Sequence, residues 1–157
     1  MLKWLWLSVL VVVLDQVSKA LASAHLHYHQ PVDVLPMFNL TLSYNTGAAF
    51  SFLGDAGGWQ RWLFVGLAVV VSVVLVLWLK RLTRREVWIA SSLALIVGGA
   101  VGNVIDRVRL GYVVDFLDVY YRSWHWPTFN IADSAITVGV TILILDGLLG
   151  RSSSRTE

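Results

Sequence analysis

The sequence has 157 residues, of which 57% are hydrophobic and 14% charged, and its formal net charge is +2. A soluble domain carries about 25% charged residues, so this composition argues against a soluble globular protein, a disordered tail and a nucleic-acid-binding protein. The sequence contains no cysteine, which excludes disulfides, thiolate metal sites, thiol nucleophiles and lipidation of a cysteine of its own. The length predicts a single domain, over residues 1–157.

Four long apolar runs follow one another along the chain, and each is long enough to cross a bilayer as a helix. We predict a mainly α membrane protein with four transmembrane helices, over residues 2–24, 62–79, 87–105 and 131–149. The first run could instead be a cleaved signal peptide ending at Ala24. Asp15 and Lys19 interrupt its apolar pattern, so a retained helix is favoured.

Basic residues indicate how the spans are oriented. The short connection between the second and third spans carries Lys80, Arg81, Arg84 and Arg85, which predicts that this connection is cytoplasmic. Four spans then place both termini in the cytoplasm and turn the segments 26–58 and 108–130 outward.

The outward segments contain strand patterns. From Phe38 to Asn45 apolar and polar residues alternate, which predicts a strand with one apolar and one polar face, suited to a membrane surface. The stretch from Val113 to Tyr121 is rich in β-branched and aromatic residues and is expected to pair with it.

Polar residues within membrane spans are costly and are functional candidates by default. Here they gather at the predicted outer ends of three spans: Asp15 and Lys19; Asn103, Asp106 and Arg107; Asn130 and Asp133. Asp115 lies in the outer segment between the last two groups. The predicted orientation therefore brings these groups to one level near the outer surface.

Structural roles explain some of these residues equally well. Asp106 and Arg107 share a helix face with Asn103, which is compatible with an Asp–Arg pair and an amide. Asp15 and Lys19 are four residues apart and predict an internal ion pair. The small residues from Gly98 to Gly102 are expected to allow close helix packing.

Asp115 and Asp133 form the sharper hypothesis. Asn130 could cap a helix in which Asp133 is a favourable first-turn anion, but Asp115 lies in an apolar stretch, where a lone carboxylate is costly. Two neighbouring carboxylates share one proton, so one can activate water while the other donates to a carbonyl oxygen. This is aspartic-protease chemistry, which needs no metal and no cofactor. Asp118 is expected to be a solvated turn residue.

Other chemistries are weaker. Ser18 and Lys19 are adjacent and would not face one another as a dyad on a helix. The alternating His25, His27 and His29 are expected to lie in a solvated loop. A proton-coupled transporter with an Asp/Lys relay and a structural membrane subunit remain alternatives to an enzyme.

Five blocks of residues, in order along nearly the whole chain, resemble the bacterial lipoprotein signal peptidase (signal peptidase II) family. The blocks are Asp15-Gln16-Val17-Ser18-Lys19, Asn45 to Ser51, Gly98 to Arg107, Val113-Val114-Asp115-Phe116 and Phe129 to Ser134. The resemblance implies four helices with a small β-cradle on the outer surface. It also implies an aspartic endopeptidase of the bacterial cytoplasmic (inner) membrane, with its active site near the outer face.

The implied substrate is a prolipoprotein whose cysteine carries diacylglycerol, cut just before that cysteine. Asp115 and Asp133 match the family's catalytic pair. Substrate contacts, inhibitor contacts or supporting roles are implied for nine further residues: Asp15, Lys19, Asn45, Gly47, Asn103, Asp106, Arg107, Asn130 and Ala132. The resemblance also implies contact with membrane lipid and inhibition by globomycin-type peptides, and a monomer is the expected state.

Overall fold

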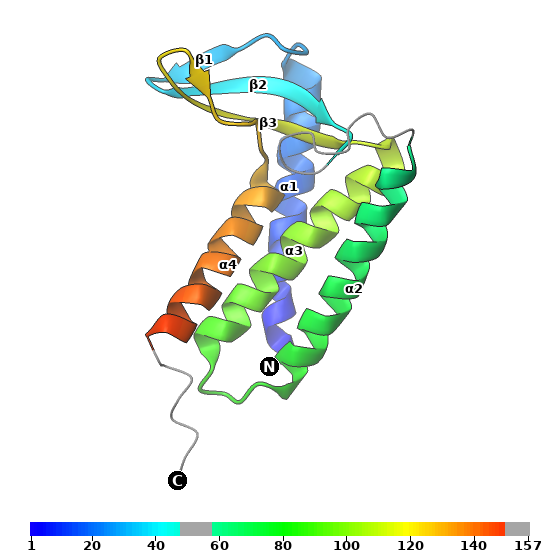
Figure 1. Ribbon diagram of the computed structural model, residues 1–157, viewed down its shortest axis with the longest axis vertical. Helices are drawn as coiled ribbons and strands as arrows, with labels where there is room; N and C mark the ends of the chain where they lie inside the picture. Colours follow the sequence, from blue (N-terminus) through cyan, green and yellow to red (C-terminus); the bar gives the residue numbers. More distant parts are fainter. Residues whose placement is uncertain (48–57, 150–157) are drawn as a thin grey trace.

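The computed structural model describes residues 1–47 and 58–149. It contains four helices long and apolar enough to cross a membrane, as predicted. In chain order the elements are η1 (Leu2–Trp4), α1 (Leu5–His25), β1 (Val32–Leu35), β2 (Phe38–Asn45), α2 (Trp59–Arg81), α3 (Val87–Leu110), β3 (Val113–Tyr121), β4 (Trp124–His125) and α4 (Ile131–Leu148). The helices form a bundle, and a small sheet covers one end of it (Figure 1).

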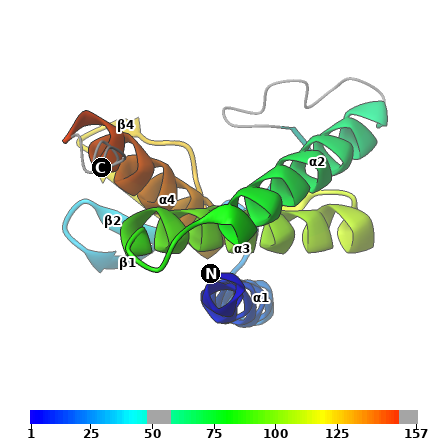
Figure 2. The same ribbon diagram turned by 90° about the horizontal axis from the view of Figure 1, so that it is seen from below.

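Helix α3 lies at the centre of the bundle and packs against α1, α2 and α4 (Figure 2). Its small residues allow this close approach. A side chain at Gly98 would meet Ser8 and Val11 of α1, and one at Gly99 would meet Ala132 of α4. The predicted packing role of the Gly98–Gly102 stretch is therefore confirmed, and α1 and α4 are drawn toward the same helix.

The sheet is antiparallel, with strand order β1-β2-β3-β4. The predicted pairing of the two longest strands is confirmed, with Asn45 opposite Val113 and Phe38 opposite Val119. A cluster of Ala22, Leu42, Val114 and Phe116 attaches the sheet to the C-terminal end of α1.

The helices extend beyond four of the predicted ends, by one residue at His25 of α1 and by two at Arg81 of α2. Helix α2 begins at Trp59 rather than at residue 62, and α3 continues to Leu110 rather than ending at residue 105. The prediction of non-helical structure from Val108 is therefore wrong by three residues. Helical hydrogen bonding tolerates the polar Arg107–Arg109 turn, and α3 ends at Leu110, followed by Gly111, whose φ of 90° suits a left-handed C-cap.

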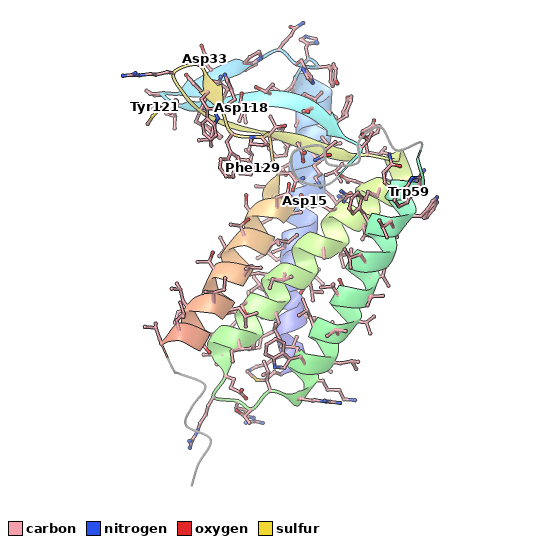
Figure 3. The ribbon with its side chains drawn as sticks, viewed as in Figure 1. Asp15, Asp33, Trp59, Asp118, Tyr121 and Phe129 are labelled. Carbon is pink, nitrogen blue, oxygen red and sulfur yellow. The ribbon has the colours of Figure 1, made fainter. Side chains whose placement is uncertain are left out.

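The expectation that Asp118 is solvated is wrong. Its side chain is buried in the sheet (Figure 3), where it accepts hydrogen bonds from Thr41 Oγ1 at 3.0 Å and His125 Nδ1 at 2.9 Å. The residue lies on β3, and β4 folds back beside it. This return of the chain covers Asp118 and could not be deduced from the local pattern.

The two ends of the bundle differ in chemistry. The connection between α2 and α3, with Arg84 and Arg85, lies at the end opposite the sheet (Figure 1). Asp15 lies in α1 on the side of the bundle nearer the sheet (Figure 3). The basic connection and the predicted site residues are therefore at different levels of the molecule.

Candidate active site

Asp133 lies at the start of α4, where it forms a reciprocal cap with Asn130. The Asn130 side-chain oxygen accepts a hydrogen bond from the Asp133 backbone N–H at 2.9 Å, and Asp133 Oδ2 accepts one from the Asn130 backbone N–H at 3.3 Å. The helix N-terminus carries partial positive charge, which stabilises an ionised carboxylate. The capping interpretation is confirmed, and the same carboxylate also lines a cavity.

Asp115 lies in the buried half of β3 and is only 2% exposed. Its two carboxylate oxygens accept hydrogen bonds from different amides. Asn130 Nδ2 donates to Oδ1 at 2.7 Å, and Asn45 Nδ2 donates to Oδ2 at 3.3 Å. The neighbouring β2 and the N-cap of α4 thus supply the polar partners that a buried carboxylate requires.

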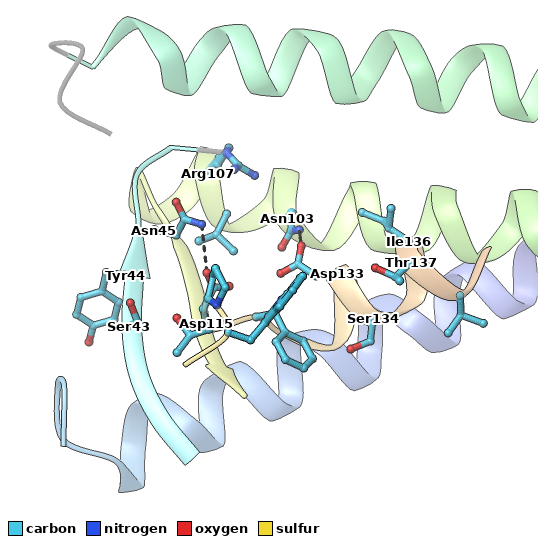
Figure 4. Close-up of a pocket in the computed structure, with 16 residues that line it drawn as sticks. Ser43, Tyr44, Asn45, Asn103, Arg107, Asp115, Asp133, Ser134, Ile136 and Thr137 are labelled. Atoms are coloured by element: carbon cyan, nitrogen blue, oxygen red, sulfur yellow. Dashed lines mark hydrogen bonds between the residues drawn. The ribbon is translucent and has the colours of Figure 1, made fainter. Parts of the chain in front are cut away.

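Two asparagine side chains connect the aspartates. Asn103 Nδ2 donates to Asp133 Oδ1 at 2.8 Å, and Asn130 Nδ2 lies 3.3 Å from Asn103 Oδ1. Figure 4 shows Asn45 reaching Asp115 and Asn103 reaching Asp133 at the wall of one cavity. Asn130 is 15 residues from Asp115 in the sequence, and Asn103 is 30 residues from Asp133. The fold joins these four residues into one polar cluster.

The cavity has a volume of about 770 Å³, within the usual range for ligand sites. It joins a polar wall, which holds both aspartates, to apolar side chains that include Ile136 and Val138 of α4. The residues that line it are Ser43, Tyr44, Asn45, Asn103, Arg107, Val113, Asp115, Trp126, Pro127, Thr128, Phe129, Asp133, Ser134, Ile136, Thr137 and Val138. Polar groups that could take part in a reaction therefore lie next to apolar side chains that could contact an apolar part of a ligand.

Burial in the protein, followed by the negative charge of Asp133, raises the pKa of Asp115 from its usual 3.8 to about 7. Hydrogen bonds from Asn45 and Asn130 and the charge of Lys19 act in the opposite direction. Asp115 therefore keeps its proton in mildly acidic solution, where an exposed aspartate would be ionised.

This displaced pKa predicts that Asp115→Asn gains stability relative to the parent protein as pH rises. The unfolded carboxyl ionises near pH 4, whereas the folded one stays protonated until about pH 7. The parent therefore loses unfolding free energy through this interval, by on the order of a few kcal/mol, and the loss is complete above it. Asparagine does not titrate and escapes the loss.

The measurement is the unfolding temperature of both proteins in detergent from pH 4 to pH 8. The difference between variant and parent should increase up to about pH 7 and then stay constant. Gly66→Ala changes no titratable group and serves as the control for effects of pH on the detergent. A difference that does not change with pH would contradict the assignment.

Behind the cavity lies a buried ionic cluster. Lys19 Nζ contacts Asp15 Oδ2 at 2.8 Å and Asp106 Oδ2 at 2.9 Å. The Asp15–Lys19 ion pair is confirmed, but Asp106 pairs with Lys19 instead of with Arg107. Asp15 Oδ1 also accepts the backbone N–H of Ala132 at 2.9 Å, which ties α1 to the first turn of α4.

Arg107 has a different partner from the one expected. Its Nη2 donates to the Gly47 carbonyl oxygen at 2.8 Å, and the Gly47 N–H donates to Asn45 Oδ1 at 3.0 Å. The guanidinium also lies 5.3 Å from the centre of the Phe64 ring. Arg107 and Gly47 thus hold the end of β2 so that the Asn45 amide faces Asp115.

Several lining residues were not singled out from the sequence. Ile136 and Thr137 follow Asp133 by three and four residues, so helical periodicity places them on its face, and this signal could have identified them. Gln16 belongs to the buried ionic cluster rather than to the cavity lining: its side-chain amide donates to Asp106 Oδ1 at 2.9 Å and to Asp15 Oδ2 at 3.2 Å. No local pattern pointed to Trp126, which the return of the chain after β4 brings to the cavity.

The weaker motifs do not join the cavity. Ser18 Oγ donates to the Asp15 carbonyl oxygen at 2.9 Å, which satisfies its hydroxyl within α1. His25, His27 and His29 are exposed, and the His25 ring is 2.9 Å from the Leu21 carbonyl oxygen. Asp15 and Lys19 belong to the buried cluster, so α1 acts as part of the fold rather than as a removable signal peptide.

Comparisons with known proteins agree with the geometry. A family model described as signal peptidase (SPase) II matches residues 7–149. The lipoprotein signal peptidase of Pseudomonas paraeruginosa is 58% identical over 154 residues, which cover 97% of this chain and 91% of the relative. That of Acinetobacter baumannii (strain ATCC 17978) is 59% identical over 143 residues, which cover 91% and 81%.

Two solved structures of bacterial membrane enzymes, determined by the in meso method at 2.3 and 1.9 Å resolution, share the fold. Their TM-scores are 0.85 and 0.80 at 32% and 30% identity, with 99% and 98% of this chain and 92% and 94% of theirs covered. The match of the family model, the sequence identity to lipoprotein signal peptidases and the common fold show that the chain is a membrane peptidase of the signal peptidase II family.

Proposed function

We propose that this chain removes the signal peptide from diacylglyceryl-modified prolipoproteins by aspartic catalysis, cutting just before the lipidated cysteine. Asp115 and Asp133 are the catalytic pair in this proposal. The observation that carries it is the meeting of two carboxylates, the buried Asp115 and the half-buried Asp133, in one cavity that also has apolar side chains along α4.

The chemistry requires one protonated and one ionised carboxylate. The ionised carboxylate takes a proton from a water molecule, whose oxygen attacks the scissile carbonyl carbon, while the protonated one donates to the carbonyl oxygen. The carboxyl that took the proton from water then gives it to the leaving amide nitrogen as the C–N bond breaks, and the other carboxylate takes a proton back from a hydroxyl of the intermediate, which restores the starting state. The raised pKa of Asp115 supports this division of roles near neutral pH.

The shape of the cavity supports a lipid-anchored substrate. Ile136, Thr137 and Val138 of α4 line it, and α4 is one of the helices suited to cross a membrane. A substrate whose acyl chains remain in the bilayer would approach along this side, with its peptide reaching the aspartates beneath the sheet. The remaining predicted residues would orient the aspartates or contact substrate: Asp15, Lys19, Asn45, Gly47, Asn103, Asp106, Arg107, Asn130 and Ala132.

The proposal includes a location. The basic connection between α2 and α3 would be cytoplasmic, which puts both termini in the cytoplasm and the aspartates near the outer face of the bacterial inner membrane. The chain would act as a single-domain monomer and would bind globomycin-type peptides. A transmembrane proton relay is disfavoured because Arg61, Lys80 and Arg81 of α2 lie near the ends of that helix.

Cleavage of a purified prolipoprotein peptide in liposomes tests this function. The diacylglyceryl form is expected to yield a free signal peptide and a fragment that begins with the lipidated cysteine, identified by mass spectrometry. The matched control is the same peptide with its cysteine capped by a small alkyl group. We expect its kcat/KM to be at least about tenfold lower, because acyl chains contribute substantial membrane binding. Equal rates would contradict selection for the lipid.

A further inference from the structure

Lys19 is a buried cation whose hydrogen-bonding capacity is fully used. Its side chain is 4% exposed, and its ammonium group contacts Asp15 at 2.8 Å, Asp106 at 2.9 Å and Asn103 Oδ1 at 3.0 Å. An ammonium group has three N–H donors and no acceptor. Each donor therefore has one partner, and the third contact points out of the ion cluster toward the catalytic aspartates.

That third contact determines how the Asn103 amide is oriented. Its oxygen faces two donors, the Lys19 ammonium and the Asn130 side-chain NH₂ at 3.3 Å. Its NH₂ group must then face the other way, where it donates to Asp133 Oδ1 at 2.8 Å. The reversed amide would place its NH₂ against the ammonium, so the presence of Lys19 excludes it.

The two aspartates consequently differ in surroundings. Asp133 receives an amide polarised by a cation and also lies at the positive end of the α4 dipole. Asp115 lies on a strand, where its donors are the neutral amides of Asn45 and Asn130. The charged groups that interact with Asp133 are Asp15 and Lys19 from α1, Arg107 from α3, and Asp115 from β3.

We propose that Lys19 is a positioning residue that acts through Asn103 to hold Asp133 as the ionised member of the pair. Asp133 then takes the proton from water, and Asp115 carries the proton given to the carbonyl oxygen. This inference rests on the function proposed above. The raised pKa of Asp115 agrees with it.

The test is the pH dependence of kcat/KM for the diacylglyceryl prolipoprotein peptide, from pH 4 to pH 9, with the full chain in detergent. Lys19→Met is expected to move the acid limb of the profile to higher pH by about one unit, because the ionised carboxylate loses its cationic support. Asn103→Ser interrupts the same bridge and should move the limb in the same direction. The double variant should move it no further than the larger single effect.

Asp106→Asn is the matched control. It disturbs the same ion cluster but removes a negative charge and leaves the contact between Lys19 and Asn103, so its acid limb should not move to higher pH. Unfolding temperatures of all variants report on the fold. If Lys19→Met does not fold, Asn103→Ser alone decides the result.

An active variant with an unchanged acid limb would overturn the role of Lys19, as would upward movement of similar size in Asp106→Asn. Neither result would affect the proposed function, which fails only if the parent protein does not cleave the peptide or if the aspartate variants retain activity.

Discussion

Replacing Asp133 with asparagine is expected to lower kcat for prolipoprotein cleavage by at least about a thousandfold, and Asp115→Asn should do the same. An asparagine cannot take a proton from water or donate a carboxyl proton, and each such acid–base role contributes about 10²- to 10⁴-fold. The substitutions keep the size of the side chains, so the helix cap at Asn130 and the sheet should persist. The assay is conversion of the diacylglyceryl peptide by protein with an unchanged oligomeric state and circular dichroism spectrum.

Asp118→Asn is the matched control for these variants. Asp118 is buried on the same strand as Asp115 and is three residues further along it, but its partners are Thr41 and His125 rather than cavity residues. We expect its kcat to stay within about threefold of the parent value. Near-normal turnover in Asp115→Asn or Asp133→Asn would end the two-carboxylate mechanism. A loss in Asp118→Asn as large as theirs would show that burial of a carboxylate, rather than chemistry, explains the effect.

The second large effect is expected for Gly99→Ala at the crossing of α3 and α4. The added methyl group would collide with the carbonyl oxygen of Ala132 and lie 2.7 Å from Ile136 Cγ1. A backbone atom cannot move aside as a flexible side chain can, so α4 must shift as a unit. Overpacking of this kind costs about 1–3 kcal/mol. The shift would also displace Asp133, which follows Ala132 directly in α4.

Gly99→Ala is therefore expected to lower the unfolding temperature by several degrees and kcat by at least about tenfold. Gly66→Ala on α2 provides the control, because within residues 1–47 and 58–149 no atom beyond its chain neighbours and the adjacent backbone of α2 lies within 4 Å of its added methyl group. That variant should keep full activity and equal or slightly higher stability, since alanine favours a helix over glycine by about 1 kcal/mol. Equal behaviour of the two variants would mean that the α3–α4 contact does not position the site.

Features that depend on local pattern were predictable from the sequence. The apolar runs are long enough to require helices in a bilayer, and the alternation from Phe38 to Asn45 follows the two-residue period of a strand. Asp15 and Lys19 are adjacent on a helix whatever surrounds it, and Asn130 and Asp133 form the cap that their spacing predicts.

Features that depend on how the elements meet were not predictable. Asp106 has Arg107 beside it in sequence, but the packing of α1 against α3 gives it Lys19 as a partner. The local sequence predicts a solvated Asp118, but in the fold β4 lies beside β3 and the side chain is buried. For Asp106 the need for a partner followed from the cost of burying a charge, whereas the burial of Asp118 was itself not foreseen. In both cases only the assembled fold could supply the identity of the partner.

The sequence by itself therefore determined a four-helix membrane protein with a small sheet and two candidate aspartates. The tertiary structure decided that the aspartates share a cavity, that Asn103 and Asn130 connect them, and that Lys19 sets the orientation of the connecting amide. The physical reason is that helical and strand periods are properties of neighbouring residues. A site of this kind instead arises where α1, α3, α4 and the sheet converge, and the distances between those elements are set by close contacts such as that of Gly99 with Ala132.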